Sequence, residues 1–195
     1  PLAAVAGAVA DAILAAMVGA GGLRRAYANT GGDVAVHLAP GEAFRIGVAR
    51  PGGARLGRVA IRAEDAPRGI ATSGRGGRSL SLGITDAVTV LAESAAAADA
   101  AATLIANAVD LPGHPAIRRE RADALQPDSD LGARRVVVGL GPLTSDDRAA
   151  ALAAGARVAD EMRAKRLIHA AALFLGDRSE TVGPAHGLIE SPEHA

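Results

Sequence analysis

The feature that most constrains the fold is a helix predicted from Ala95 to Val109 with one narrow polar seam. Its polar residues are Asp99, Thr103 and Asn107, and their spacing of four places them on successive turns of one helix face. The other positions are Ala, Leu, Ile and Val, so most of the helix is expected to be buried. A carboxylate in such surroundings needs a metal ion, a ligand donor or a backbone amide, because burying an unpaired charge is costly.

Length and composition limit the number of domains, the partners and the cysteine chemistry that this protein can have. The 195 residues fit one domain or two packed subdomains, 1–110 and 111–195. Lys+Arg and Asp+Glu both total 21, so the overall charge gives no reason to expect nucleic acid or a membrane surface as partner. The chain has no Cys, which excludes disulfides and thiolate chemistry and fits a cytoplasmic protein.

The first segment is predicted to be a buried helix. Residues 2–18 are small or apolar except for Asp11, a pattern typical of a helix covered on most sides. Asp11 and the low hydrophobicity of Ala and Gly argue against a membrane span. The apolar helix suggests a homodimer, and the start at Pro1 suggests that residues upstream are missing.

The rest of the chain reads as strands with helices between and after them. A second helix is expected from Thr144 or Ser145 to about Arg166, capped at its start and basic at its end. Residues 111–132 are expected to form an exposed excursion, and the tail from Asp177 a loop. The order of elements predicts an α+β fold with mixed α/β layers. Strands are predicted at 24–30, 34–38, 44–49, 58–63, 68–73, 85–92 and 135–141, and 167–176 is predicted to be a buried strand or a mixed segment.

Two glycine-containing turns are candidate ligand sites. The loop from Ser73 to Ser79 offers glycine amides and the guanidinium groups of Arg75 and Arg78 to a phosphate or carboxylate. Its alternative is a hairpin with solvated arginines. The turn 29–33 lies between apolar strands, and Asp33 could hold a ligand hydroxyl or ring N–H. Its alternative is a tight hairpin built from good turn residues, joined by Gly31 and Gly32.

The polar seam is a candidate metal site. Asp99 and Thr103 are hard oxygen ligands at helical spacing, which suits Mg²⁺, and Asp86 could add a second carboxylate. In the alternative interpretation Asp99 accepts from a backbone amide and Thr103 bonds back to its own helix. The five histidines show no metal-ligand spacing, and no nucleophile motif is present, so the catalytic residues stay unknown.

Together these segments resemble a known family. The order NTGGDVAVH, RGIATSG and DAVTVLAESAAAADAAAT is similar to the motif order of the FAD:protein FMN transferase (ApbE) family. The resemblance covers roughly residues 1–110 and implies an ApbE-like fold with a cleft for flavin and Mg²⁺. It implies that Asp99 and Thr103 contact the metal. It also places the two glycine turns in the same cleft.

The sequence also departs from the transferases. They carry an H-I-I-D-P-x-T-G segment where this chain has GRGGRSLSLGIT, so it resembles a short, uncharacterised ApbE-like branch. We expect a protein that binds a flavin-like or phosphorylated small molecule with Mg²⁺, with metal-assisted phosphoryl or flavin transfer or hydrolysis. The alternative is a non-catalytic ligand-binding or assembly protein. The predicted ligand-binding residues are Asn29, Gly31, Gly32, Asp33, Thr72, Ser73, Gly74, Arg75, Arg78 and Ser79, and the predicted metal ligands are Asp99, Thr103 and Asp86.

Overall fold

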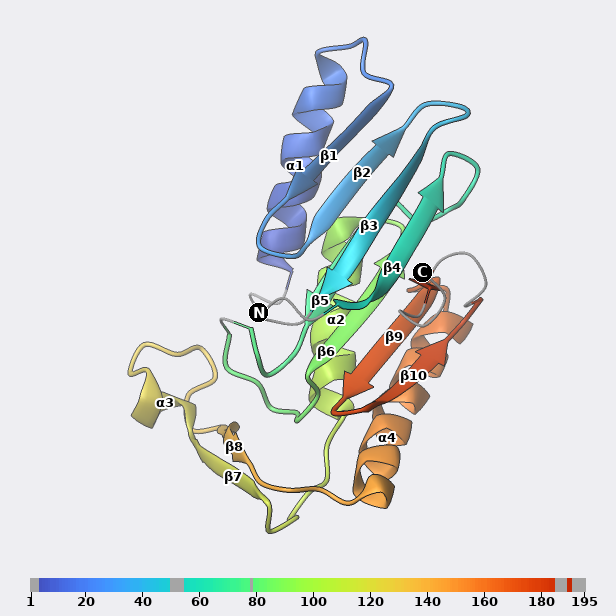
Figure 1. The fold of residues 1–195 in the computed structure, drawn as a ribbon. Helices are drawn as coiled ribbons and strands as arrows, with labels where there is room; N and C mark the ends of the chain where they lie inside the picture. Colours follow the sequence, from blue (N-terminus) through green and yellow to red (C-terminus); the bar gives the residue numbers. More distant parts are fainter. Residues whose placement is uncertain (1–3, 50–54, 78, 185–188, 191–195) are drawn as a thin grey trace.

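A six-stranded sheet is the centre of the fold (Figure 1). The computed structural model describes residues 4–49, 55–77, 79–184 and 189–190. The strand order in the sheet is β1-β2-β5-β6-β9-β10, and every neighbouring pair is antiparallel. The strands are β1 (Arg25–Asn29), β2 (Val34–Leu38), β5 (Gly69–Ser73), β6 (Ala87–Ala92), β9 (Ala170–Leu175) and β10 (Arg178–Val182).

Helices cover one face of this sheet. They are α1 (Val5–Gly19), α2 (Ala95–Ala108) and α4 (Ser145–Ala164). The largest apolar cluster lies between the sheet and α2 and α4, and includes Val88, Val90, Ile105 and Leu173, all fully buried. α1 packs on β1 and β2 and against α2 through small residues such as Ala10 and Ala28. One side of α2 is therefore buried as predicted, whereas Leu104, outside the polar seam, is 54% exposed.

A smaller sheet covers the opposite face. It has the order β11-β4-β3 and consists of β3 (Ala43–Ala49), β4 (Arg55–Arg62) and β11 (Ile189–Glu190). Its inner side packs Val59 and Ile61 against Val36, Ile70 and Leu91 of the large sheet. The predicted α+β fold with mixed layers is confirmed: helices, large sheet and small sheet lie one upon another. The Pro/Gly turn expected at 51–53 lies outside the described residues.

The prediction that residues 111–132 form an exposed excursion without regular structure was wrong. It contains β7 (Ile117–Arg121) and α3 (Ala122–Leu125), and β7 pairs with β8 (Arg135–Leu140) in a two-stranded ribbon. β8 is also not the buried strand that was expected, because only Val136 in it is buried. β7 carries three arginines and one glutamate, so no apolar alternation marks it in the sequence.

Two further predictions need correction. The tail after Asp177 contains the edge strand β10, whose residues are exposed except Val182, and the short β11. Main-chain hydrogen bonds to β9 hold such a polar edge strand, so apolar periodicity cannot reveal it. α1 is also not covered on most sides: only Gly7 and Ala10 are buried in it, and Val9 and Ile13 are 45% and 46% exposed.

The predicted helix caps are confirmed. The Ser94 hydroxyl accepts from the amide of Ala97 at 3.2 Å and begins α2. Thr144 and Asp147 form a reciprocal capping box at the start of α4. The hydrogen bond from the Thr144 side chain lowers the pKa of Asp147 from its ordinary value.

Two glycines of α1 allow a matched test of its packing. A Cβ on Gly7 would lie 2.3 Å from the carbonyl oxygen of Ala95, whereas a Cβ on Gly19 would meet nothing within 4 Å. We expect Gly7→Ala to lower the free energy of unfolding by about 2 kcal/mol or more, because α1 must move off α2. Gly19→Ala should raise it by about 0.5–1 kcal/mol through helix propensity. Urea unfolding measures both, and equal effects would contradict the close contact.

Candidate functional site

α1 and α2 cap each other through two carboxylates. Asp99 Oδ2 on α2 accepts from the amide of Gly7, near the start of α1, at 3.0 Å. Asp11 on α1 accepts from the amides of Ala95 and Ala96, the first two residues of α2, at 3.0 and 2.9 Å. The helices are therefore antiparallel, and each supplies a negative group to the positive end of the other.

This contact explains the environment of Asp99. The N-cap position of α1 is Ala4, which has no side-chain oxygen, so a carboxylate from another helix takes that role. Burial raises the pKa of Asp99 from its ordinary value, and the hydrogen bond from Gly7 opposes that rise. The alternative interpretation of Asp99, a carboxylate that accepts from a backbone amide, is the arrangement observed.

The turn 29–33 lies at the same end of α1. Gly31 and Gly32 have φ values of 77° and 119°, which favour glycine, and Asn29 Oδ1 accepts from the Gly32 amide at 3.0 Å. The Thr30 hydroxyl donates to the carbonyl of Ala6 at 2.5 Å, one residue before Gly7. The hairpin predicted at Gly31 and Gly32 is thereby confirmed, and it is fixed to the helix that Asp99 caps.

β5 brings the second glycine motif next to this turn. A Cβ on Gly32 would lie 3.9 Å from the carbonyl oxygen of Thr72, and the Thr72 hydroxyl shares a hydrogen bond of 2.9 Å with Thr89 on β6. Ser73 is half-buried at the end of β5. Asp99 and the turn 29–33 therefore both contact the first residues of α1, and Thr72 at the end of β5 lies beside Gly32.

Arg75 and Asp86 form an ion pair. Arg75 Nη2 lies 2.7 Å from Asp86 Oδ1, and Asp86 Oδ2 accepts from the Gly176 amide at 2.7 Å. A Cβ on Gly74 would lie 2.4 Å from the Asp86 carbonyl oxygen, so this position needs glycine. Asp86 thus holds the glycine-rich loop to the turn between β9 and β10. Ser79 is exposed, and Arg78 lies outside the described residues.

Two of the predicted magnesium ligands, Asp86 and Asp99, have different partners. Asp86 precedes β6, whereas Asp99 lies in the second turn of the helix that follows β6 and faces α1. Thr103 is half-buried one turn beyond Asp99, and Asn107 accepts from the Leu82 amide at 3.1 Å. Among the described residues no group of three or more His, Cys, Asp or Glu side chains is placed to hold a metal ion.

A hollow of about 290 Å³ opens between the two sheets at the edge where β1 and β3 lie. We call it the β1–β3 hollow. Tyr27 and Phe44 meet there edge to face, with ring centroids 5.9 Å apart, and the Arg25 guanidinium lies 5.8 Å from the Phe44 centroid. Asn29 links the hollow to the turn 29–33. Its lining residues are Tyr27, Asn29, Val34, Val36, Phe44, Arg45 and Ile46.

Sequence reasoning found only Asn29 among these lining residues. The chain has one Tyr and two Phe, and this hollow brings together the Tyr and one Phe, so the rarity of aromatic residues was a usable signal. Tyr27 also alternates with the buried Ala26 and Ala28, which leaves it 58% exposed on the other side of β1. Asp11, the lone charge in an apolar helix, was the second signal, because it served only as an argument against a membrane span and its contact with the start of α2 was missed.

The comparisons with known proteins assign a family. The family model described as "AbpE bacteria" matches residues 1–181. The chain belongs to this family. It is also similar to the UPF0280 protein of Methanothermobacter thermautotrophicus, with 37% identity over 114 residues. That match covers 57% of this chain and 43% of the relative, so the chain matches less than half of the relative's length.

In the described part of the chain, no helix has the length and apolar character needed to cross a membrane.

Asp99 can be tested as a cap. Asp99→Ala should lower the free energy of unfolding by about 1–2 kcal/mol, because the Gly7 amide loses its acceptor. Asp99→Asn should cost less, because its amide oxygen can still accept. The raised pKa means that the folded state holds the Asp99 proton more tightly than the unfolded state. The contribution of Asp99 to stability should therefore fall as pH rises from the ordinary Asp value through the raised one, and Asp99→Asn should remove that trend.

Urea unfolding across this acidic range, at matched ionic strength, measures both effects. Ser129→Ala, in the loop before β8, is a control outside the α1–α2 contact. If Asn and Ala at position 99 destabilised the protein equally, the hydrogen bond that the Gly7 amide donates to residue 99 would contribute nothing to stability.

Proposed function

We propose that this chain is an ApbE-like protein that binds a flavin-like, aromatic small molecule in the β1–β3 hollow. Binding, rather than group transfer, is the function that the geometry supports best. The observation that carries the proposal is a concave site that joins two aromatic rings to a family motif, the turn 29–33, through one residue, Asn29.

The lining of the hollow suits a planar ring. Val34, Val36 and Ile46 form an apolar floor, while Tyr27 stands 58% exposed at its rim. Ligand sites combine such apolar walls with a few polar groups that fix orientation. Here the side chain of Asn29 supplies such a group. An exposed aromatic ring beside an empty hollow gains contact area when a second ring stacks on it.

The resemblance to the ApbE family supports a flavin as the first ligand to try. The turn 29–33 belongs to the motifs that carry that resemblance, and Asn29 presents its side chain to Gly32 within the turn while lining the hollow. A ligand ring in the hollow would therefore lie next to a motif that the family places in its flavin cleft.

Riboflavin tests the proposal because it has the ring and lacks a phosphate. We expect riboflavin to bind saturably, and the change in its fluorescence measures the binding. Tyr27→Ala should weaken it roughly tenfold, the loss of one stacking partner. Leu167→Ala removes an apolar side chain of similar exposure, 55%, outside the hollow and should leave binding unchanged. Absence of riboflavin binding, or equal effects of the two substitutions, would contradict the proposal.

A second candidate function is Mg²⁺-dependent transfer through Asp99 and Thr103, which lie one turn apart on the same face of α2. The described donors do not by themselves fit the ion, because Asp99 already accepts from Gly7 at the positive end of α1. We therefore derive no chemical step through a metal. A melting temperature that rises with MgCl₂ in the native protein and not in Asp99→Asn would favour this candidate.

A further inference from the structure

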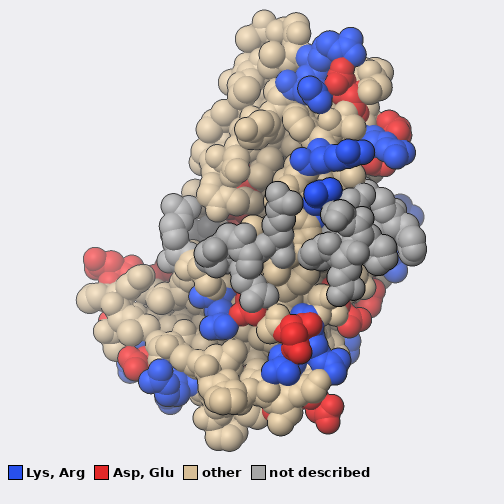
Figure 2. Space-filling view, viewed as in Figure 1, with Lys and Arg blue, Asp and Glu red and all other residues tan. Residues whose placement is uncertain are grey.

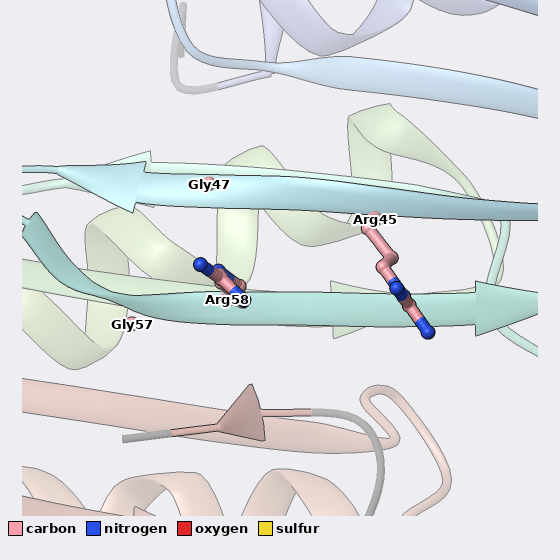
Figure 3. Close-up of a pocket in the computed structure, with 4 residues that line it drawn as sticks. All are labelled: Arg45, Gly47, Gly57 and Arg58. Atoms are coloured by element: carbon pink, nitrogen blue, oxygen red, sulfur yellow. The ribbon is translucent and has the colours of Figure 1, made fainter. Parts of the chain in front are cut away.

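A second hollow adjoins the first on the outer side of the β3–β4 hairpin. Its volume is about 230 Å³, and it is lined by Arg45, Gly47, Gly57 and Arg58 (Figure 3). We call it the Arg58 hollow. Arg45 lines both hollows, so the two are neighbours. In Figure 3, Arg45 reaches from β3 across β4, and the Arg58 side chain stays beside β4, on the side that faces β3.

Arginine is frequent in the segment that forms β3 and β4. From Ala43 to Arg62 the sequence has five arginines and no acidic residue. Figure 2 shows Lys and Arg side chains over the part of the surface that β1 to β4 form, with Asp and Glu side chains beside them. Arg24 and Arg25 share the carboxylate of Glu42, whereas no carboxylate of residues 4–49, 55–77 and 79–184 lies within ion-pair distance of Arg45 or Arg58.

The glycines give the hollow its floor. Gly47 is opposite Arg58 in the β3–β4 register, and on its other side Arg58 is opposite Glu190 of β11. A Cβ on Gly47 would meet nothing within 4 Å, so neither packing nor backbone conformation demands glycine there. Glycine within a strand weakens it and often marks a place where a ligand or another chain approaches.

We propose that the Arg58 hollow is an oxyanion subsite for the ligand whose ring lies in the β1–β3 hollow. The inference rests on the proposed function and adds the class of ligand: an aromatic ring that carries a phosphate. Arg58 pairs with the phosphate oxygens over the Gly47 floor, and Arg45 lies between phosphate and ring. A guanidinium group suits this task because its fork of N–H donors matches phosphate geometry.

The comparison of FMN with riboflavin tests the subsite, because the two differ by one phosphate. We expect the native protein to bind FMN about tenfold or more tightly than riboflavin. Arg58→Gln should abolish that preference while leaving riboflavin binding unchanged. Arg157→Gln removes an exposed arginine from α4, on the opposite side of the large sheet, and should keep the preference.

Gly47→Val adds a steric test that keeps every charge. The side chain has space at this position and suits a strand, so the melting temperature should hold or rise while the preference for FMN is lost. An unchanged FMN preference in Arg58→Gln and in Gly47→Val would overturn the inference. If riboflavin itself does not bind, the proposed function fails, and inorganic phosphate then tests the subsite alone. Shifts of the Gly47 amide resonance that vanish in Arg58→Gln support it, and the absence of shifts overturns it.

Discussion

The mutual capping of α1 and α2 is the interaction on which the candidate site depends. Two carboxylates, Asp11 and Asp99, satisfy the free amides of two helix starts that lie about ninety residues apart in the chain. The contact is close because Gly7 has no Cβ that would meet Ala95. Since Thr30 is tied to Ala6 in the same turn of α1, the pairing of the helices also fixes the hairpin between β1 and β2.

That hairpin sets the open edge of the two-sheet stack. β1 ends the large sheet and β3 ends the small one, so both sheets have a strand edge on the same side of the molecule. At this edge the two sheets leave the β1–β3 hollow open between them, and Tyr27, Phe44 and Arg45 are among the residues that line it. The same helix contact that buries Asp99 thus positions the strand that presents Tyr27 to solvent.

Much of the fold could be predicted from local patterns. Ser94 and Thr144 begin helices because their hydroxyls accept from amides three residues on, which spacing alone reveals. Gly31 and Gly32 predicted the hairpin for a similar reason. β7 and β10 were missed because polar strands held by main-chain hydrogen bonds leave no apolar alternation. The exposed side of α1 was missed because composition does not show which neighbours a helix has.

The site was predictable only in part, for a different reason. The convergence of the turn 29–33 with Thr72 and with the helix that Asp99 caps followed from a resemblance, whereas the partner of Asp99 lies 92 positions away and no spacing rule links them. The approach of Tyr27 to Phe44 requires two sheets to stack, and Arg58 reaches the same surface only through the register of β3 with β4. A site formed by residues that are far apart in the chain is therefore hard to predict from a single sequence.

Amide hydrogen exchange with and without FMN tests most directly where the ligand lies. We expect slower exchange in the presence of FMN along β1 and β3, from Tyr27 to Asn29 and from Phe44 to Gly47, with little change at Gly7 and in the first turn of α2. Slower exchange confined to the glycine-rich loop and the residues around Asp99, with none on β1 or β3, would contradict it.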